Sequence, residues 1–72
     1  MNEEEIKVLG KISKYKEISP DKLHKILSKY FEDKWERKFL IKKFKEMGIL
    51  KLKRDGFFDI NPDMIKEFTG EI

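Results

Sequence analysis

The residues of this sequence that could do chemistry are lysines, and their spacing places them on one side of a helix. In an ideal helix over residues 34–47, at about 100° per residue, Lys34, Lys38, Lys42 and Lys45 fall within about 80° of one another. An apolar side formed by four residues of the same stretch faces away from the lysines, and its members are Leu40, Ile41, Phe44 and Met47. Because ammonium groups pair well with phosphate oxygens, this lysine stripe predicts a surface that binds a polyanion.

The charge distribution along the chain extends this prediction beyond the helix. The net charge is only +3, yet residues 34–54 contain nine basic residues against two acidic ones, so the remainder is net acidic. We expect helix and hairpin tip to form one basic patch, whose members are Lys34, Arg37, Lys38, Lys42, Lys45, Lys53 and Arg54. The alternative is that the lysines form the solvated face of a lysine-rich protein and that the hairpin tip is charged for solubility.

The residue types of the patch indicate what it would recognise. Flexible lysines position a protein on phosphates, whereas bidentate reading of guanine favours arginine and reading of adenine favours Asn or Gln. The helix has one arginine, Arg37, at the edge of its apolar side, and it has no Asn or Gln. We therefore expect modest sequence preference and affinity dominated by counterion release.

Two helices are predicted before the lysine stripe. Residues 3–17 read as an amphipathic helix, with Ile6, Leu9 and Ile12 as its apolar side, Val8 and Tyr15 flanking it, and acids in the first turn. Ile18 fits a short extended stretch. Ser19-Pro20-Asp21 then starts a second helix that ends near Phe31-Glu32, with Leu23, Ile26, Leu27 and Tyr30 on its buried side.

The third helix is bounded by a capping box of Asp33 and Glu36 and by Gly48 at its C-terminal end. Residues 49–53 and 57–60 alternate like half-buried strands, joined by Asp55-Gly56, both of which tolerate the positive φ of tight hairpin turns. Asn61-Pro62-Asp63 begins a last short helix with an apolar side of Met64, Ile65 and Phe68.

Three helices, a glycine after the third, a basic-tipped hairpin and a closing helix resemble the winged helix-turn-helix superfamily. The segment from Phe39 to Leu50 looks like the end of that superfamily's recognition helix, with two apolar anchors, a glycine and an aliphatic pair entering the wing. The resemblance implies a mostly helical α+β fold, a single domain over residues 1–72 with a three-helix core. It also implies double-stranded DNA binding through a recognition helix at 34–47 and a wing at 49–60, in a small transcription regulator or a chromatin or replication accessory factor.

Several aromatic residues leave a second function open. Trp35 and Phe39 fall outside the apolar side of the third helix, where they either cover the end of the second helix or anchor a partner protein or a second copy of the chain. Strand alternation buries only one of Phe57 and Phe58, and Phe68 and Ile72 either complete the core or pair two chains. The alternative function is therefore a protein-interaction module; recognition of structured RNA would use the same basic patch.

Other functions lack support in the residues present. There is no cysteine for a disulfide or thiolate zinc site, His24 is the only histidine, and phosphate-loop, nucleophile-elbow and dinucleotide-binding patterns are absent, so we expect no enzyme, metal, cofactor or small-molecule ligand. No apolar run is long enough for a membrane span, and we expect a cytoplasmic protein. Abundant Lys and Glu without Gln suggest a thermophile. One small module buries little surface on DNA, which favours a homodimer or a larger assembly.

Overall fold

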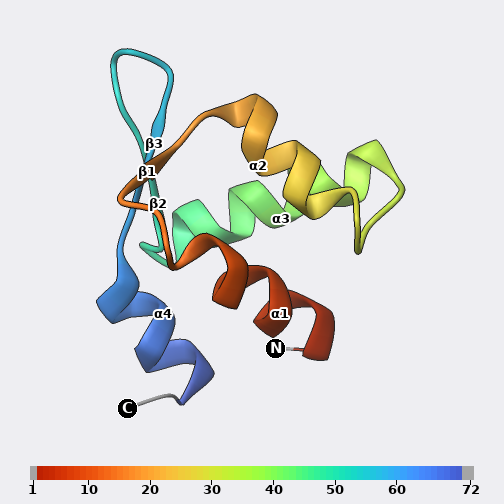
Figure 1. The fold of residues 1–72 in the computed structure, drawn as a ribbon, viewed down its shortest axis with the longest axis horizontal. Coiled ribbons are helices and arrows are strands. Elements are labelled where there is room, and N and C mark those ends of the chain that lie inside the picture. Colours follow the sequence, from red (N-terminus) through yellow and green to blue (C-terminus); the bar gives the residue numbers. More distant parts are fainter. Residues whose placement is uncertain (1, 71–72) are drawn as a thin grey trace.

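The computed structural model describes residues 2–70 and shows four helices around a three-stranded antiparallel sheet (Figure 1). This arrangement confirms the predicted, mostly helical α+β class. The elements in chain order are α1 (Glu3–Ile12), β1 (Glu17–Ile18), α2 (Pro20–Leu27), α3 (Lys34–Glu46), β2 (Leu50–Leu52), β3 (Phe58–Ile60) and α4 (Pro62–Thr69).

Helix α1 begins with a capping box that the sequence interpretation overlooked. Asn2 Oδ1 accepts a hydrogen bond from the Glu5 backbone N–H at 2.8 Å, and the Glu5 carboxylate accepts from the Asn2 backbone. The helix ends at Ile12, five residues before the predicted end at Glu17. The apolar spacing continues to Tyr15, but residues 17 and 18 pair with β3, and strand geometry there is incompatible with a continuing helix.

The core forms between the inner sides of the helices and one face of the sheet. Its fully buried side chains are Val8, Leu9, Ile12, Leu23, Leu27, Phe44 and Ile49. The prediction for α1 was wrong for Ile6, which is 37% exposed, whereas Val8, expected only to flank the apolar side, is fully buried. The apolar side is thus rotated relative to the predicted one, and Glu5 is buried beside it.

The connection between α2 and α3 differs from its prediction in two details. Helix α2 ends at Leu27 rather than near Phe31, because the chain turns through residues 28–30 and returns Phe31 to the core. At the start of α3, Asp33 caps the helix by accepting from the Trp35 N–H at 3.0 Å. The reciprocal bond from Glu36 is not formed, so the predicted capping box is only a cap.

The sheet has the order β1-β3-β2, with Ile18 opposite Phe58 and Leu50 opposite Ile60. The β2–β3 hairpin turns through three residues, 54–56: the Gly56 N–H donates to the Lys53 carbonyl, and the Lys53 N–H donates to the Phe57 carbonyl. Of these two turn residues, only Gly56 has a positive φ, of 90°. Asp55 instead accepts from the Phe57 N–H through its side chain.

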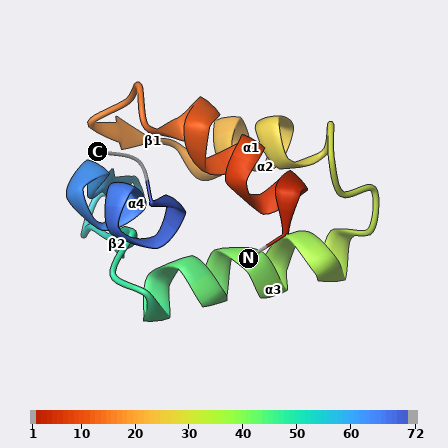
Figure 2. The ribbon, with the colours of Figure 1, turned by 90° about the horizontal axis from the view of Figure 1, so that it is seen from below.

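Helix α4 starts as predicted, with Asn61 capping the helix and Pro62 in its first turn. It buries Ile65, whereas Phe68 is 43% exposed. Figure 2 shows α3 along one edge of the molecule, with α1 and α2 on its inner side and α4 beside the sheet. One long side of α3 is therefore left facing outward.

Candidate nucleic-acid interface

Helix α3 is held by its apolar side, as the sequence predicts. Phe44 is fully buried and Leu40 is 5% exposed, with Ile41 and Met47 packed against the same core. Gly48 ends the helix with a φ of 78°, a conformation that favours glycine, and the chain then enters β2. This packing determines which residues of α3 face solvent.

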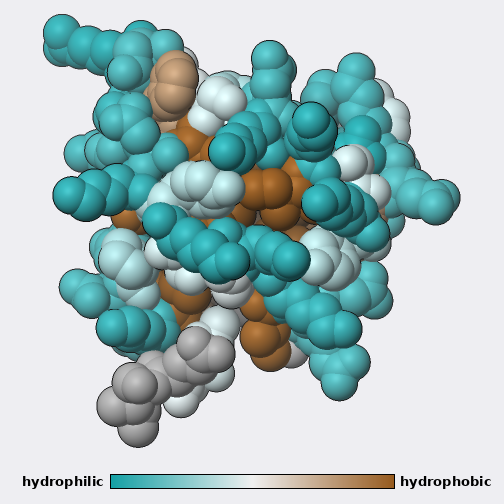
Figure 3. All heavy atoms as spheres, viewed as in Figure 1, coloured by the Kyte–Doolittle hydropathy of each residue, from teal (hydrophilic) through white to brown (hydrophobic). Residues whose placement is uncertain are grey.

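Four lysines lie on the outward side of α3, and all of them are exposed: Lys34, Lys38, Lys42 and Lys45. None of the four forms an ion pair with a carboxylate within residues 2–70. Polar residues cover most of the face drawn in Figure 3, so polarity alone does not single out a surface. Exposed lysines on other elements are unpaired as well, so what distinguishes these four is that they lie together on one side of a single helix. We call them the lysine stripe.

Arg37 was predicted to belong to the basic patch, but its guanidinium is bonded to the protein backbone. Its Nη1 donates to the backbone carbonyls of Phe31 and Glu32 at 2.8 and 2.7 Å. These carbonyls belong to the connection between α2 and α3, which Arg37 thereby ties to the first turns of α3. A guanidinium bonded in this way is poorly placed to reach a ligand, and we leave it out of the proposed contact surface.

Lys43 is also used by the fold, in a contact that sequence reasoning missed. Its Nζ lies 2.8 Å from Glu5 Oε2 and joins α3 to α1. Burial raises the pKa of Glu5, but the hydrogen bonds from Lys43 and the Asn2 backbone outweigh it and hold the pKa below its ordinary value of 4.5. Thirty-eight residues separate the two partners, and no local pattern indicates the pair.

The hairpin tip contributes less free charge than predicted. Lys53 Nζ lies 3.0 Å from Glu17, 3.6 Å from Asp55 and 3.7 Å from Asp59. The hydrogen bond to Glu17, with the charges of Asp55 and Asp59, raises the pKa of Lys53 above its ordinary value of 10.5. Arg54, exposed and forming no ion pair within the described residues, is the cation that this tip can offer to a ligand.

Two of the three aromatic residues of α3 are not covered by the rest of the protein. Trp35 is 73% exposed and Phe39 is 68% exposed, so the interpretation that they cover the end of α2 is wrong. The Lys38 ammonium lies over the indole of Trp35, 5.0 Å from the ring centroid. In the hairpin, alternation acts as predicted, with Phe58 buried and Phe57 39% exposed. Ile72, the other candidate for pairing two chains, lies outside the described residues.

His24 on α2 reports the electrostatic environment at the boundary with α3. Burial lowers its pKa below the ordinary value of 6.5, and the positive charges of Arg37, Lys38 and Lys34 lower it further, against the opposing charge of Asp21. Burial is the largest cause of this shift, and the charges of Arg37, Lys38 and Lys34 add to it from the first half of α3.

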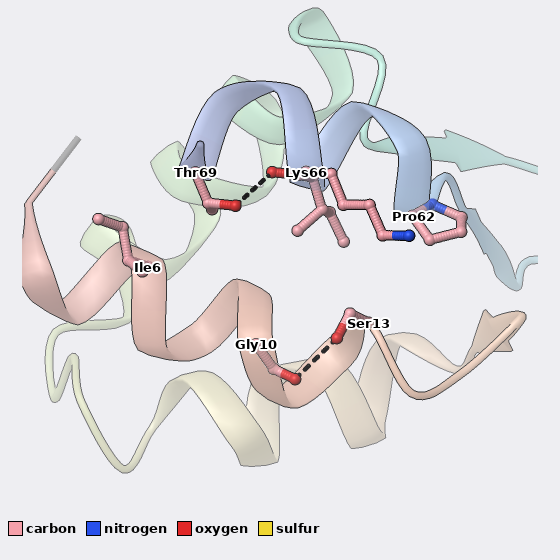
Figure 4. Close-up of a pocket in the computed structure, with 7 residues that line it drawn as sticks. Ile6, Gly10, Ser13, Pro62, Lys66 and Thr69 are labelled. Atoms are coloured by element: carbon pink, nitrogen blue, oxygen red, sulfur yellow. Dashed lines mark hydrogen bonds between the residues drawn. The ribbon is translucent and has the colours of Figure 1, made fainter. Parts of the chain in front are cut away.

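A second surface feature is the shallow cleft between α1 and α4 (Figure 4). It has a volume of about 260 Å³, and Ile6, Gly10 and Ser13 face Pro62, Lys66 and Thr69 across it. The hydroxyls of Ser13 and Thr69 donate to carbonyls of their own helices, those of Gly10 and Ile65. The cleft thus lacks a nucleophile–base pair or a convergent set of polar groups that would act on a ligand.

Residues 2–70 contain no group of three or more His, Cys, Asp or Glu side chains arranged to hold a metal ion. None of the four helices has the length and apolar character needed to cross a membrane.

In comparisons with known proteins, no protein-family model, no curated protein and no solved structure matches this chain.

Proposed function

We propose that this protein binds double-stranded DNA, with α3 in the major groove and the β2–β3 hairpin against the adjacent backbone. The observation that carries the proposal is the lysine stripe, four exposed and unpaired ammonium groups on the outward side of one helix. The major groove is about 12 Å wide and admits a helix of about 10–12 Å with its side chains. Phosphates flank the groove on both sides, where lysines can reach them.

The arrangement of the elements supports a winged helix-turn-helix assignment. The α2 and α3 helices are consecutive and joined by a short connection, which Arg37 holds through two carbonyls. The hairpin of β2 and β3 follows α3 directly, and β1 pairs with β3 to complete a small sheet. In this assignment α3 is the recognition helix, the hairpin is the wing, and Arg54 is its phosphate contact.

The chemistry of the surface favours a small transcription regulator or a chromatin or replication accessory factor of modest sequence preference. Lysines hold phosphates without reading bases, and the arginine of α3 is bonded to the backbone. A single module of this kind covers about 600–1,000 Å² on DNA, so useful affinity calls for two copies or a larger assembly.

Titration of a random-sequence duplex of roughly 20 base pairs, spanning about two helical turns, tests the proposal at several salt concentrations. An equal-length single strand serves as the comparison. Each phosphate neutralised contributes about −0.9 to the slope of log K against log salt, so four lysines and Arg54 predict a slope of about −4 to −5 for the duplex. Tighter binding to the single strand, or no duplex binding at low salt, would overturn the proposal.

A protein-interaction module is the second candidate, favoured by the exposure of Trp35 and Phe39. Such a module would bind its partner through apolar contacts that respond weakly to salt. Absence of duplex binding, together with salt-insensitive self-association of the chain, would support it over DNA binding.

A further inference from the structure

Trp35 lies in line with the lysine stripe on the outward side of α3. Lys42 follows it by seven residues, which separates their directions by only about 20° around the helix axis. Lys38, one turn away, places its ammonium over the indole face at 5.0 Å. A ligand that contacts both lysines therefore cannot leave the indole in solvent.

The lysines also restrict what can cover the indole. A purely apolar protein surface would desolvate the neighbouring ammonium groups without pairing them, which is unfavourable. A duplex pairs the ammonium groups with phosphates and presents base edges to the residue beside them. Charge complementarity thus favours DNA as the occupant of this surface.

The floor of the major groove offers one apolar group, the C5-methyl of thymine; the other groups on base edges there are hydrogen-bond donors and acceptors. An indole pressed against polar edges would remove water from them and return, at most, one hydrogen bond from its N–H. Pressed against thymine methyls, the indole buries apolar surface on both sides. Resting on the proposed DNA binding, we infer that Trp35 reads thymine methyl groups and gives the protein a preference for thymine-containing sites.

Phe39 extends the same contact along one flank. It follows Trp35 by four residues and lies about 40° further round the helix, toward α1. Its 68% exposure leaves its ring available beside the indole. The two rings together can span successive thymines along the edge of the lysine stripe.

The test compares two duplexes of identical alternating A·T sequence, one with thymine and one with uracil, which lacks only the C5-methyl. The native protein should bind the thymine duplex about three- to tenfold more tightly, since methyl burial contributes on this scale. In Trp35→Ala, the affinity ratio of the two duplexes should fall most of the way to one, because only the smaller contact of Phe39 remains. Because the exposed indole contributes little to the core, the circular dichroism spectrum and thermal midpoint should stay unchanged.

The matched control is Phe68→Ala, which removes an exposed aromatic from α4 and should retain the native thymine-to-uracil ratio. Any effect of uracil on duplex shape is common to all variants and cancels in the comparison. Trp35 is the only tryptophan of the chain, so its fluorescence should also change on binding the thymine duplex.

Two outcomes overturn the inference in distinguishable ways. Equal binding of both duplexes by the native protein, or an unchanged ratio in Trp35→Ala, rejects methyl recognition while leaving DNA binding intact. Failure to bind either duplex at low salt rejects DNA binding itself, and with it the inference.

Discussion

The outward side of α3 and the tip of the β2–β3 hairpin are both basic in sequence, but they differ in how many of their basic side chains form ion pairs. On α3 the lysine stripe is exposed and forms no ion pair within residues 2–70. At the hairpin, Lys53 lies within 4 Å of three carboxylates, from Glu17, Asp55 and Asp59. Only Arg54 keeps its charge free there. The basic patch predicted from the sequence is therefore mainly one helix.

The difference shows why summing charges along the sequence overestimates the unpaired charge of a sheet more than that of a helix. Neighbours on a helix surface are three or four residues apart, so a window of sequence contains them. Neighbours across strands come from distant segments. Glu17 is 36 residues from Lys53, and only the pairing of β1 with β3 brings its carboxylate to the hairpin.

The largest effect that would test this comparison is a charge reversal on α3. Lys38→Glu/Lys42→Glu should abolish duplex binding, because two phosphate contacts become repulsive. The corresponding neutral variant, Lys38→Met/Lys42→Met, should reduce the salt slope by about 2. The thermal midpoint should stay nearly unchanged, since both side chains are exposed. Titration and thermal unfolding measure the two quantities on the same samples.

The matched control is Lys7→Glu/Lys11→Glu, which changes the net charge equally at the same spacing on the exposed side of α1. This variant should weaken binding only modestly, through the loss of overall charge. An equal loss in both double variants would mean that net charge, and not the lysine stripe, controls binding.

A smaller effect concerns Lys43, the lysine of α3 that resembles Lys53 in being paired. In Glu5→Gln the ion pair is lost, while glutamine can still serve the capping box with Asn2. The unfolding free energy at pH 7 should fall by about 1 kcal/mol, a value reduced because Lys43 is partly open to solvent.

The pH dependence of this difference follows from the lowered pKa of Glu5. A carboxyl whose pKa is lower in the folded protein contributes stability that is fully present above its unfolded value near 4.5. That contribution is lost as the pH falls through the folded pKa. Denaturant unfolding of both proteins between pH 7 and pH 3 should show the difference shrinking as the pH falls; a constant difference would assign it to something other than this ionisation.

The smallest expected effects distinguish the roles of Arg54 and Lys53, the two cations of the hairpin tip. Arg54→Ala should weaken duplex binding a few-fold and reduce the salt slope by about 1, without changing stability. Lys53→Ala should instead lower the thermal midpoint, because Glu17, Asp55 and Asp59 are left without their cation, and the loss should shrink at high salt. Equal reductions of the salt slope in both variants would show that Lys53 also contacts phosphate.

Much of the local structure could be predicted because its causes are local. Ser19 and Asn61 begin helices by accepting backbone N–H groups, and Gly48 and Gly56 supply positive φ where the chain turns. The apolar side of α3 was predicted from periodicity alone. The errors lie at the ends of α1 and α2, where pairing with β3 and the return of Phe31 to the core outweigh the helical spacing.

The sequence predicted most of the residues that belong to the candidate site, but it did not predict what each of them does. Lys34, Lys38, Lys42 and Lys45 were identified from their spacing, and the structure leaves them exposed. Arg37 was assigned to the same surface because an angular position does not reveal a carbonyl within reach of its guanidinium. The sequence could not decide whether Trp35 and Phe39 are exposed, because it does not show which side of α3 packs against α2.

The sequence by itself determined the element types, their order and the lysine stripe, because caps, turns and helical periodicity act between residues at most a few positions apart. The tertiary structure decided which charges remain free. An ion pair depends on distances of a few ångströms between side chains from separate elements, as for Lys43 with Glu5 and Lys53 with Glu17. Those distances are set by the packing of the helices on the sheet, a property of the whole chain.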